Sequence, residues 1–166
     1  LGDVYKRQLE DNPSYLNFPG DGQKVEYKEG VFVGYRYYDM KKMPVRYPFG
    51  YGLSYGDVQV EKAEFAKAPE KEQDAEICVT VKNHSEVATR DVVEVYIKNQ
   101  DSKYAPVNPA LCGFAKVSLG AGEEKELTIT VSKEAYKVVN DEGEKIFDSS
   151  SSILSVSYTH LTLPTI

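Results

Sequence analysis

The chain has 166 residues, a formal net charge of −6 and a pI near 5.0, values that fit one or at most two globular domains. No apolar run approaches the roughly 20 residues that cross a bilayer, so the sequence predicts no membrane segment. Its 20 basic residues are scattered among 26 acidic ones and form no basic face, which argues against a nucleic-acid partner.

The two ends of the chain are expected not to be native. Residues 1–8, which read LGDVYKRQ, resemble one translation of a transposase mosaic end used to build sequencing libraries. Residues 156–165, VSYTHLTLPT, match the reverse complement of that element continued into its read adaptor. Because such additions are set aside before the fold is considered, we take 1–8 and 156–166 as adaptor-derived. His84 is then the only native histidine.

The native part begins with a segment, from Leu9 to about Tyr55, that is dense in Tyr, Gly and Pro. Pairs that favour turns fill its first part: Asn12-Pro13, Pro19-Gly20 and Asp21-Gly22. Residues 24–38 are rich in β-branched and aromatic side chains and are interrupted by two glycines, which predicts a strand with a bulge. So short and turn-rich a segment buries too little surface to be a domain, so its aromatic residues need another surface to cover them.

From about Val58 the pattern changes to short alternating runs separated by turns, which is typical of an antiparallel sandwich. The expected strands lie at 58–65, 76–82, 91–98, 111–119, 126–131, 146–147 and 153–154. Alternation predicts these inward side chains: Ile77, Val79, Val81, Val93, Val95, Ile97, Leu127, Ile129 and Val131. We expect a bend at Gly113 and a loop or helical turn at 132–139. Seven strands in about 100 residues is the size of an immunoglobulin or fibronectin-like unit.

Residues that could carry catalytic or metal chemistry are few. Glu26, Glu29 and Asp39 could form a glycosidase carboxylate pair, but nothing in the sequence shows them converging, so structural roles are preferred. His84 lies in a polar turn and is expected at the surface. Without it the native chain holds no Ser-His-Asp set and no plausible metal site.

The cysteines and the aromatic residues each leave two interpretations. Cys78 and Cys112 lack CxxC spacing, so free thiols are expected, with Cys78 as a small core residue; a single bridge between them is the alternative. An aromatic stripe could stack sugars, but packing against a neighbouring domain is the preferred role. Its members are Tyr35, Tyr37, Tyr38, Tyr47, Phe49, Tyr51 and Tyr55.

Two long motifs resemble a known family. The run EYKEGVFVGYRYYD, residues 26–39, followed by YPFGYGLSY, residues 47–55, looks like the junction after the second catalytic domain of the family 3 glycoside hydrolases, the β-glucosidase group. The runs at 79–98 and 105–131 are similar to the fibronectin type III-like domain that follows in those enzymes. The chain departs from common family residues at strand-entry and surface positions: Gly56, His84 and Cys112.

The resemblance implies an all-β architecture: an immunoglobulin/fibronectin type III-like antiparallel sandwich at 57–155. Before it would come the C-terminal tail of the second catalytic domain, an α/β sandwich, at 9–42, and a Tyr/Gly/Pro-rich aromatic linker at 43–56. The parent would be a retaining exo-β-glycosidase that removes terminal non-reducing sugars and needs no cofactor or metal. The family's nucleophilic Asp and acid/base Glu would lie upstream, so we expect no catalytic, cofactor-binding or metal-binding residue in this chain.

The expected partners are the upstream catalytic domains of the same parent chain and the parent's oligosaccharide or glycoside substrate, with no nucleic acid and no membrane. The compartment is not fixed by these residues, and the cytoplasm is the working expectation. For the chain itself the first hypothesis is mechanical: it docks onto the catalytic domains and stabilises them. The alternative is a carbohydrate- or protein-binding sandwich without catalysis. A free-standing adhesion module is disfavoured by the uncovered aromatic residues of the linker.

Overall fold

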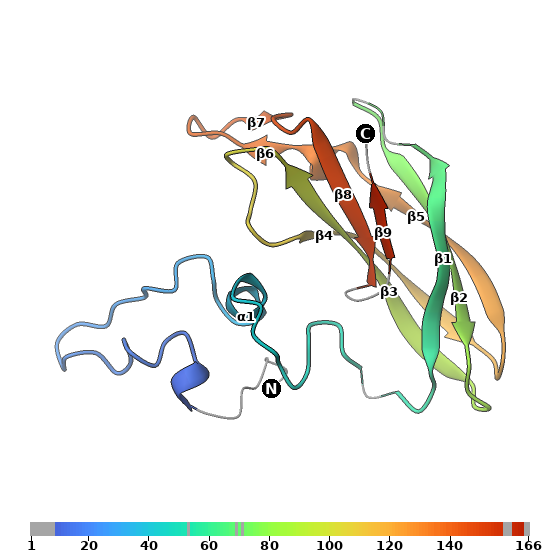
Figure 1. The fold of residues 1–166 in the computed structure, drawn as a ribbon, viewed down its shortest axis with the longest axis horizontal. Helices are drawn as coiled ribbons and strands as arrows, with labels where there is room; N and C mark the ends of the chain where they lie inside the picture. Colours follow the sequence, from blue (N-terminus) through green and yellow to red (C-terminus); the bar gives the residue numbers. More distant parts are fainter. Residues whose placement is uncertain (1–8, 53, 69, 71, 158–160, 165–166) are drawn as a thin grey trace. The chain divides into compact units, whose positions relative to one another are not determined.

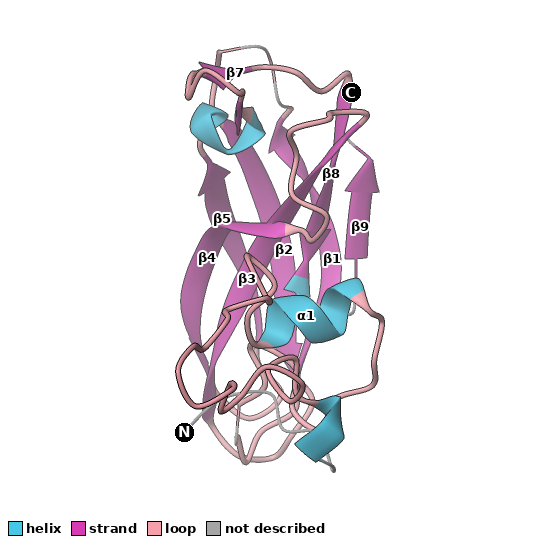
Figure 2. Ribbon diagram, turned by 90° about the vertical axis from the view of Figure 1, so that its left-hand side faces the viewer, coloured by secondary structure: helices cyan, strands magenta, loops and turns pink. Residues whose placement is uncertain are grey.

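The computed structural model describes residues 9–52, 54–68, 70, 72–157 and 161–164. The chain divides into two compact units, Leu1–Tyr51 and Gly52–Ile166. Helices are confined to short pieces, and no helix in the described residues is long and apolar enough to span a membrane. Most of the regular structure is strand, shown in magenta in Figure 2, and every strand in the described residues lies in the second unit.

The first unit contains one 3-10 turn, η1 (Leu9–Asp11), and one short helix, α1 (Tyr35–Met40), connected by turns. The strand predicted over 24–38 is therefore wrong, and its last residues begin α1. Gly30 and Gly34 adopt positive φ angles of 58° and 57°, which an extended strand does not use, and Gly34 is the N-cap of α1. High β-propensity reflects packing against neighbouring strands, and within the described part of this unit no strand is available.

The second unit is an antiparallel β-sandwich (Figure 1), which confirms the predicted all-β class. One sheet has the order β1-β2-β5 and the other β4-β3-β8-β9, while β6 and β7 pair separately. The elements, in chain order, are β1 (Val58–Lys67), β2 (Ala75–Asn83), β3 (Thr89–Gln100), β4 (Ala110–Leu119), β5 (Glu124–Val131), the 3-10 helix η2 (Lys133–Tyr136), β6 (Val138–Val139), β7 (Lys145–Ile146), β8 (Ser151–Val156) and β9 (Leu161–Pro164).

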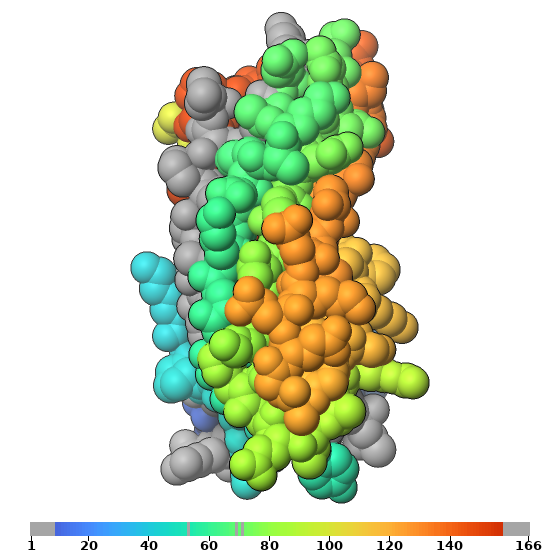
Figure 3. Space-filling model, turned by 90° about the vertical axis from the view of Figure 1, so that its right-hand side faces the viewer, coloured from blue at the N-terminus to red at the C-terminus, as the bar shows by residue number. Residues whose placement is uncertain are grey.

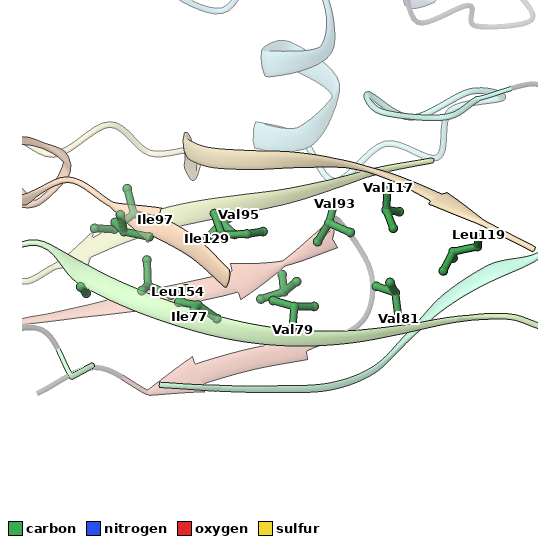
Figure 4. Packing of buried hydrophobic residues seen from close by; sticks show 13 residues of the cluster. Ile77, Val79, Val81, Val93, Val95, Ile97, Val117, Leu119, Ile129 and Leu154 are labelled. Carbon is green, nitrogen blue, oxygen red and sulfur yellow. The ribbon is translucent and has the colours of Figure 1, made fainter. Parts of the chain in front are cut away.

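The core lies between the two sheets and follows the predicted alternation (Figure 4). Of the nine side chains expected to point inward, eight are buried in it and Leu127 packs at its edge. The rest of the buried cluster comes from three strands: Ala75, Val117, Leu119, Leu154 and Val156. Each apolar side chain of this size that leaves water stabilises the fold by about 1.5–3 kcal/mol, so the core is the main source of the sandwich's stability.

One predicted strand lies outside the sandwich. The strand expected at 146–147 overlaps β7 at Ile146, and β7 pairs with β6 in a small hairpin. Asn140 closes that hairpin by accepting hydrogen bonds from the backbone N–H groups of Glu142 and Glu144, so the chain turns back before it reaches either main sheet. The position beside β8 is filled by β9, within the segment that we expect to be adaptor-derived. That assignment stays a prediction.

The predicted bend at Gly113 is present as an irregularity in the β3–β4 ladder. Val95 pairs with Gly113, but the next residue, Tyr96, pairs with Leu111, so Cys112 is an extra residue in β4, as in a β-bulge. A Cβ atom at position 113 would lie 3.0 Å from Cγ2 of Ile129 and 3.2 Å from the Thr130 carbonyl oxygen. Glycine therefore lets β4 pass close to β5.

Gly56, just before β1, lies directly against Thr89 of β3. A Cβ atom at position 56 would lie 2.5 Å from both Cβ and Cγ2 of Thr89, and the hydroxyl groups of Ser54 and Thr89 are hydrogen-bonded at 2.6 Å. We therefore expect Gly56→Ala to lower the free energy of unfolding by about 1–3 kcal/mol, because side-chain crowding forces the strand entry to shift. Urea unfolding measures the loss. The loss should shrink in a Thr89→Gly background, and fully additive effects would contradict this contact.

Candidate functional site

Two of the three carboxylates that could have formed a glycosidase pair have local partners, and the third residue lies in α1. Glu26 forms an ion pair with Lys28 at 2.7 Å. A hydrogen bond from the Ser14 side chain holds the pKa of Glu29 below its ordinary value. Asp39 lies in α1, where its backbone carbonyl accepts from the N–H of Lys42. Within the described residues, no three His, Cys, Asp or Glu side chains form a group that could hold a metal ion.

His84 lies in the turn after β2, where the sequence predicted a surface residue. Its Nε2 lies 2.5 Å from Oε1 of Glu61 on β1, and its backbone N–H donates to the Asp57 carbonyl at 2.7 Å. Both contacts tie the end of β2 to the beginning of β1. His84 thus links two neighbouring strands at the end of their sheet.

Both cysteines are free, as predicted, but their positions differ from the expectation. Cys78 was predicted as a core residue; instead it lies on the outer face of its sheet, because Ile77 and Val79 on either side of it point into the core. Cys112 is the extra residue of the β4 bulge, packs against the core and donates its thiol to the Val95 carbonyl at 3.3 Å.

Burial raises the pKa of the Cys112 thiol to about 12. Because only the thiolate reacts, we expect iodoacetamide at about pH 8 to modify Cys112 in the folded chain on the order of a thousandfold more slowly than in denaturant. Peptide mapping after timed alkylation measures the ratio for each cysteine separately. Rapid labelling of Cys112 in the native chain would show that its site opens readily.

Asn83, at the end of β2, is a fully buried polar side chain. Its Nδ2 donates to the carbonyl oxygens of Val87 and Gly120, both at 2.8 Å. Its Oδ1 accepts from the backbone N–H of Ser85 at 3.0 Å and from the Ser85 hydroxyl at 2.6 Å. One amide therefore holds together the β2–β3 and β4–β5 turns. The local half of this pattern, Asn followed two residues later by Ser, is readable as an Asx turn.

The two outer faces of the sandwich differ in polarity. The outer face of β1-β2-β5, seen in Figure 3, carries ion pairs between Lys62 and Glu64 at 2.7 Å and between Lys82 and Glu124 at 4.0 Å. The outer face of β3 and β4 carries exposed apolar side chains. We call the latter the Phe114 face; its residues are Val92, Glu94, Tyr96, Leu111, Phe114 and Lys116.

The first unit and the residues just after it expose large apolar side chains. Leu16 is 89% exposed, Tyr27 87% and Tyr55 99%. Within the aromatic stripe, Tyr35 pairs with Phe49 at a centroid distance of 4.7 Å and Tyr47 with Tyr51 at 5.2 Å. The other exposed large apolar residues before β1 are Leu9, Tyr15, Phe18, Val25, Val31, Val33, Tyr47, Phe49 and Tyr51. These side chains are therefore candidates for burial against another surface.

The family model of the fibronectin type III-like domain matches residues 91–156, which together with the two antiparallel sheets defines the class of the sandwich. Over 145 residues the chain is 41% identical to "Thermostable beta-glucosidase B" of Acetivibrio thermocellus, a match that covers 84% of the chain and 19% of that protein. It is also 41% identical over 128 residues to "Exo-alpha-(1->6)-L-arabinopyranosidase" of Bifidobacterium longum, covering 77% of the chain and 17% of that protein.

Comparison with solved structures finds the same group of proteins. The chain superposes on a GH3 β-glucosidase of Bifidobacterium adolescentis with a TM-score of 0.80 and 32% identity, covering 98% of the chain and 25% of that structure. A Kluyveromyces marxianus β-glucosidase in complex with glucose gives the same TM-score and identity, covering 99% and 21%. The resemblance to the family 3 glycoside hydrolases is thereby confirmed: the chain corresponds to the part of such a protein that carries the fibronectin type III-like domain. It spans about a fifth of the length of the curated relatives it matches.

Proposed function

We propose that this chain is the C-terminal accessory part of a retaining exo-β-glycosidase of the β-glucosidase type. In this proposal it supplies no catalytic residue; it docks onto the catalytic domains of its parent and stabilises them. The observation that carries the proposal is the exposure of large apolar side chains before β1, of which Leu16, Tyr27 and Tyr55 are almost fully exposed. Each large apolar side chain of this kind that becomes buried lowers the free energy by about 1.5–3 kcal/mol.

The chemistry of the described side chains supports an accessory role. A retaining glycosidase needs two carboxyl groups about 5–5.5 Å apart on either side of the scissile bond. Two carboxylates of residues 26–39 are instead engaged locally, Glu26 with Lys28 and Glu29 with Ser14. In the proposal the nucleophile and the acid/base therefore belong to the parent's upstream domains.

The relatives also indicate where sugar specificity would be decided. Over this region the chain is 41% identical both to a relative named as a β-glucosidase and to one named as an arabinopyranosidase. We infer that the substrate of the parent is a glycoside whose sugar is selected by the catalytic domains.

The alternative function, a carbohydrate-binding sandwich, has one observation in its favour: the Phe114 ring is 62% exposed on a sheet face, and an exposed aromatic ring can stack on a sugar. Such modules commonly gain affinity from several aromatic rings, whereas the sandwich contains no Trp. Retention of the chain on cellulose, lost on Phe114→Ala, would favour this alternative.

Exposed aromatic surface gives the uncovered chain a measurable property. We expect it to bind the dye ANS and to aggregate with increasing concentration, because Leu16, Tyr27 and Tyr55 are exposed to solvent. Replacing the three by serine should reduce both dye fluorescence and light scattering while leaving the unfolding midpoint of the sandwich unchanged. Equal dye binding by the unsubstituted chain and the triple serine variant would show that these three side chains do not cause the dye binding.

The most direct genetic test is the coding sequence upstream of Leu9. The proposal expects it to encode an eight-stranded α/β barrel and a second α/β domain, with a nucleophilic Asp upstream of residues 26–39. A parent gene without these domains would overturn the enzyme assignment.

A further inference from the structure

The outer face of the β4-β3-β8-β9 sheet departs from the usual pattern for an antiparallel sheet, in which the face away from the core is polar. On β3 and β4, Glu94 lies opposite Phe114, Val92 opposite Lys116, and Tyr96 opposite Leu111. None of the apolar members of these pairs belongs to the core cluster. Phe114 is 62% exposed, Leu111 46% and Val92 41%, whereas Tyr96 is 3% exposed and forms a buried part of this face.

The bulge at Cys112 produces this apolar face. Because the extra residue turns its own side chain toward the core, Leu111 and Phe114, three residues apart, both point outward from one strand. The Tyr96 hydroxyl donates to Glu94 at 2.6 Å and holds the carboxylate beside Phe114. An apolar centre bordered by a carboxylate and Lys116 has the composition of a protein–protein interface.

The opposite outer face provides an internal comparison. Its Lys62–Glu64 and Lys82–Glu124 ion pairs and the exposed Thr128 are typical of a sheet surface in contact with water. The two outer faces of the sandwich therefore differ in kind: one is polar, and the other carries exposed apolar side chains.

We propose that the Phe114 face is the surface by which the sandwich docks onto the catalytic domains of its own parent chain. This inference rests on the proposed function and names the contact that the proposed function requires. The chain spans about a fifth of its relatives, so a parent of similar length holds most of its surface outside this segment. The tether 52–57 has six residues and reaches at most about 20 Å, which keeps those domains near the sandwich at a high effective concentration. A face of modest area is then sufficient.

Cysteine footprinting tests the docking face in the full-length parent. Phe114→Cys reports the Phe114 face, and Thr130→Cys is the matched control at an exposed position on the opposite face, where its cross-strand neighbour is Glu76. The thiol at position 114 should be alkylated at least about tenfold more slowly in the parent than in the 166-residue chain. The thiol at position 130 should react equally in both. Equal rates at position 114 would overturn the proposal.

A second pair of variants tests the contribution of the face to stability. Phe114→Lys places a cation opposite Glu94, a favourable cross-strand pair, so the sandwich itself should keep its unfolding midpoint. In the parent it should speed thermal inactivation about tenfold, whereas Thr128→Lys should leave the rate unchanged. An unchanged inactivation rate for Phe114→Lys would contradict the proposal.

Two other occupants would also be recognised. Slow alkylation at position 114 in the 166-residue chain, relieved by dilution, would assign the face to a second copy and overturn the proposal. Cellulose binding that Phe114→Lys abolishes would assign it to carbohydrate, with the same consequence. Hydrolysis of an aryl β-glycoside by the same parent preparation reports on the proposed function separately, so an active parent with a fully reactive position 114 would overturn only the docking face.

Discussion

Replacing Asn83 by alanine is expected to lower the free energy of unfolding of the sandwich by about 3 kcal/mol. The substitution removes the two hydrogen bonds that Nδ2 donates to the Val87 and Gly120 carbonyls and the two that Oδ1 accepts from Ser85. Each buried polar group that loses its partner costs about 1–3 kcal/mol, and water entering the space left by the amide offsets part of the sum. Urea unfolding followed by far-UV circular dichroism measures the change.

A matched control is Asn140→Ala, in the β6–β7 turn. Asn140 also accepts two backbone hydrogen bonds, but these bonds are exposed, so its loss should cost less than about 1 kcal/mol. Asn83→Asp should be at least as harmful near neutral pH, because it removes both donors and buries a charge. Burial raises the pKa of such a carboxyl, so this variant should regain stability as the pH falls and the group becomes protonated. Equal losses at positions 83 and 140 would contradict a special role for Asn83.

Deleting residues 57–155 from the full-length parent is expected to cause the largest loss of stability in its catalytic domains. If docking buries three large side chains of the sandwich together with the aromatic residues before it, their loss removes on the order of 5 kcal/mol or more from the stability of the catalytic domains. The truncated parent should be recovered mainly as aggregate, and its soluble fraction should lose activity on heating far sooner than the intact enzyme. Residual hydrolysis after timed incubation at raised temperature measures the effect.

The control for that deletion is the sandwich supplied as a separate chain. At high concentration it should slow the inactivation of the truncated parent, and a Phe114→Lys sandwich should do so less well. A truncated parent that matches the intact enzyme in solubility, heat resistance and activity would contradict the accessory role.

The sandwich could be predicted from sequence because the alternation of apolar and polar residues that marks each strand can be read within the strand itself. Strand β2 reads as alternating apolar and polar residues, and Ile77, Val79 and Val81 are buried as that alternation requires. The same logic located β1, β3, β4, β5 and β8. It failed at 24–38, where β-branched and aromatic residues form turns and α1, because strand propensity is realised only beside another strand.

The contacts that fix the turns of the sandwich and the direction of Phe114 join residues distant in sequence. Asn83 reaches Gly120, 37 residues away, and Gly56 lies against Thr89; neither pair has a local signal. Phe114 could be seen to break the alternation of β4, but its outward direction follows from the bulge at Cys112, whose place is set by pairing with β3. The domain boundaries and the adaptor origin of residues 1–8 and 156–166 stay predictions that the parent gene will test.

The central claim, that this chain is a non-catalytic part of a glycosidase, is tested most directly by hydrolysis of chromogenic aryl β-glycosides. The full-length parent and the 166-residue chain are compared at equal molar concentration over a panel of sugars. The parent should release the aryl alcohol from at least one member, whereas the purified chain should release none above the buffer rate. Hydrolysis by the chain alone, or a folded full-length parent that hydrolyses no member of the panel, would contradict the claim.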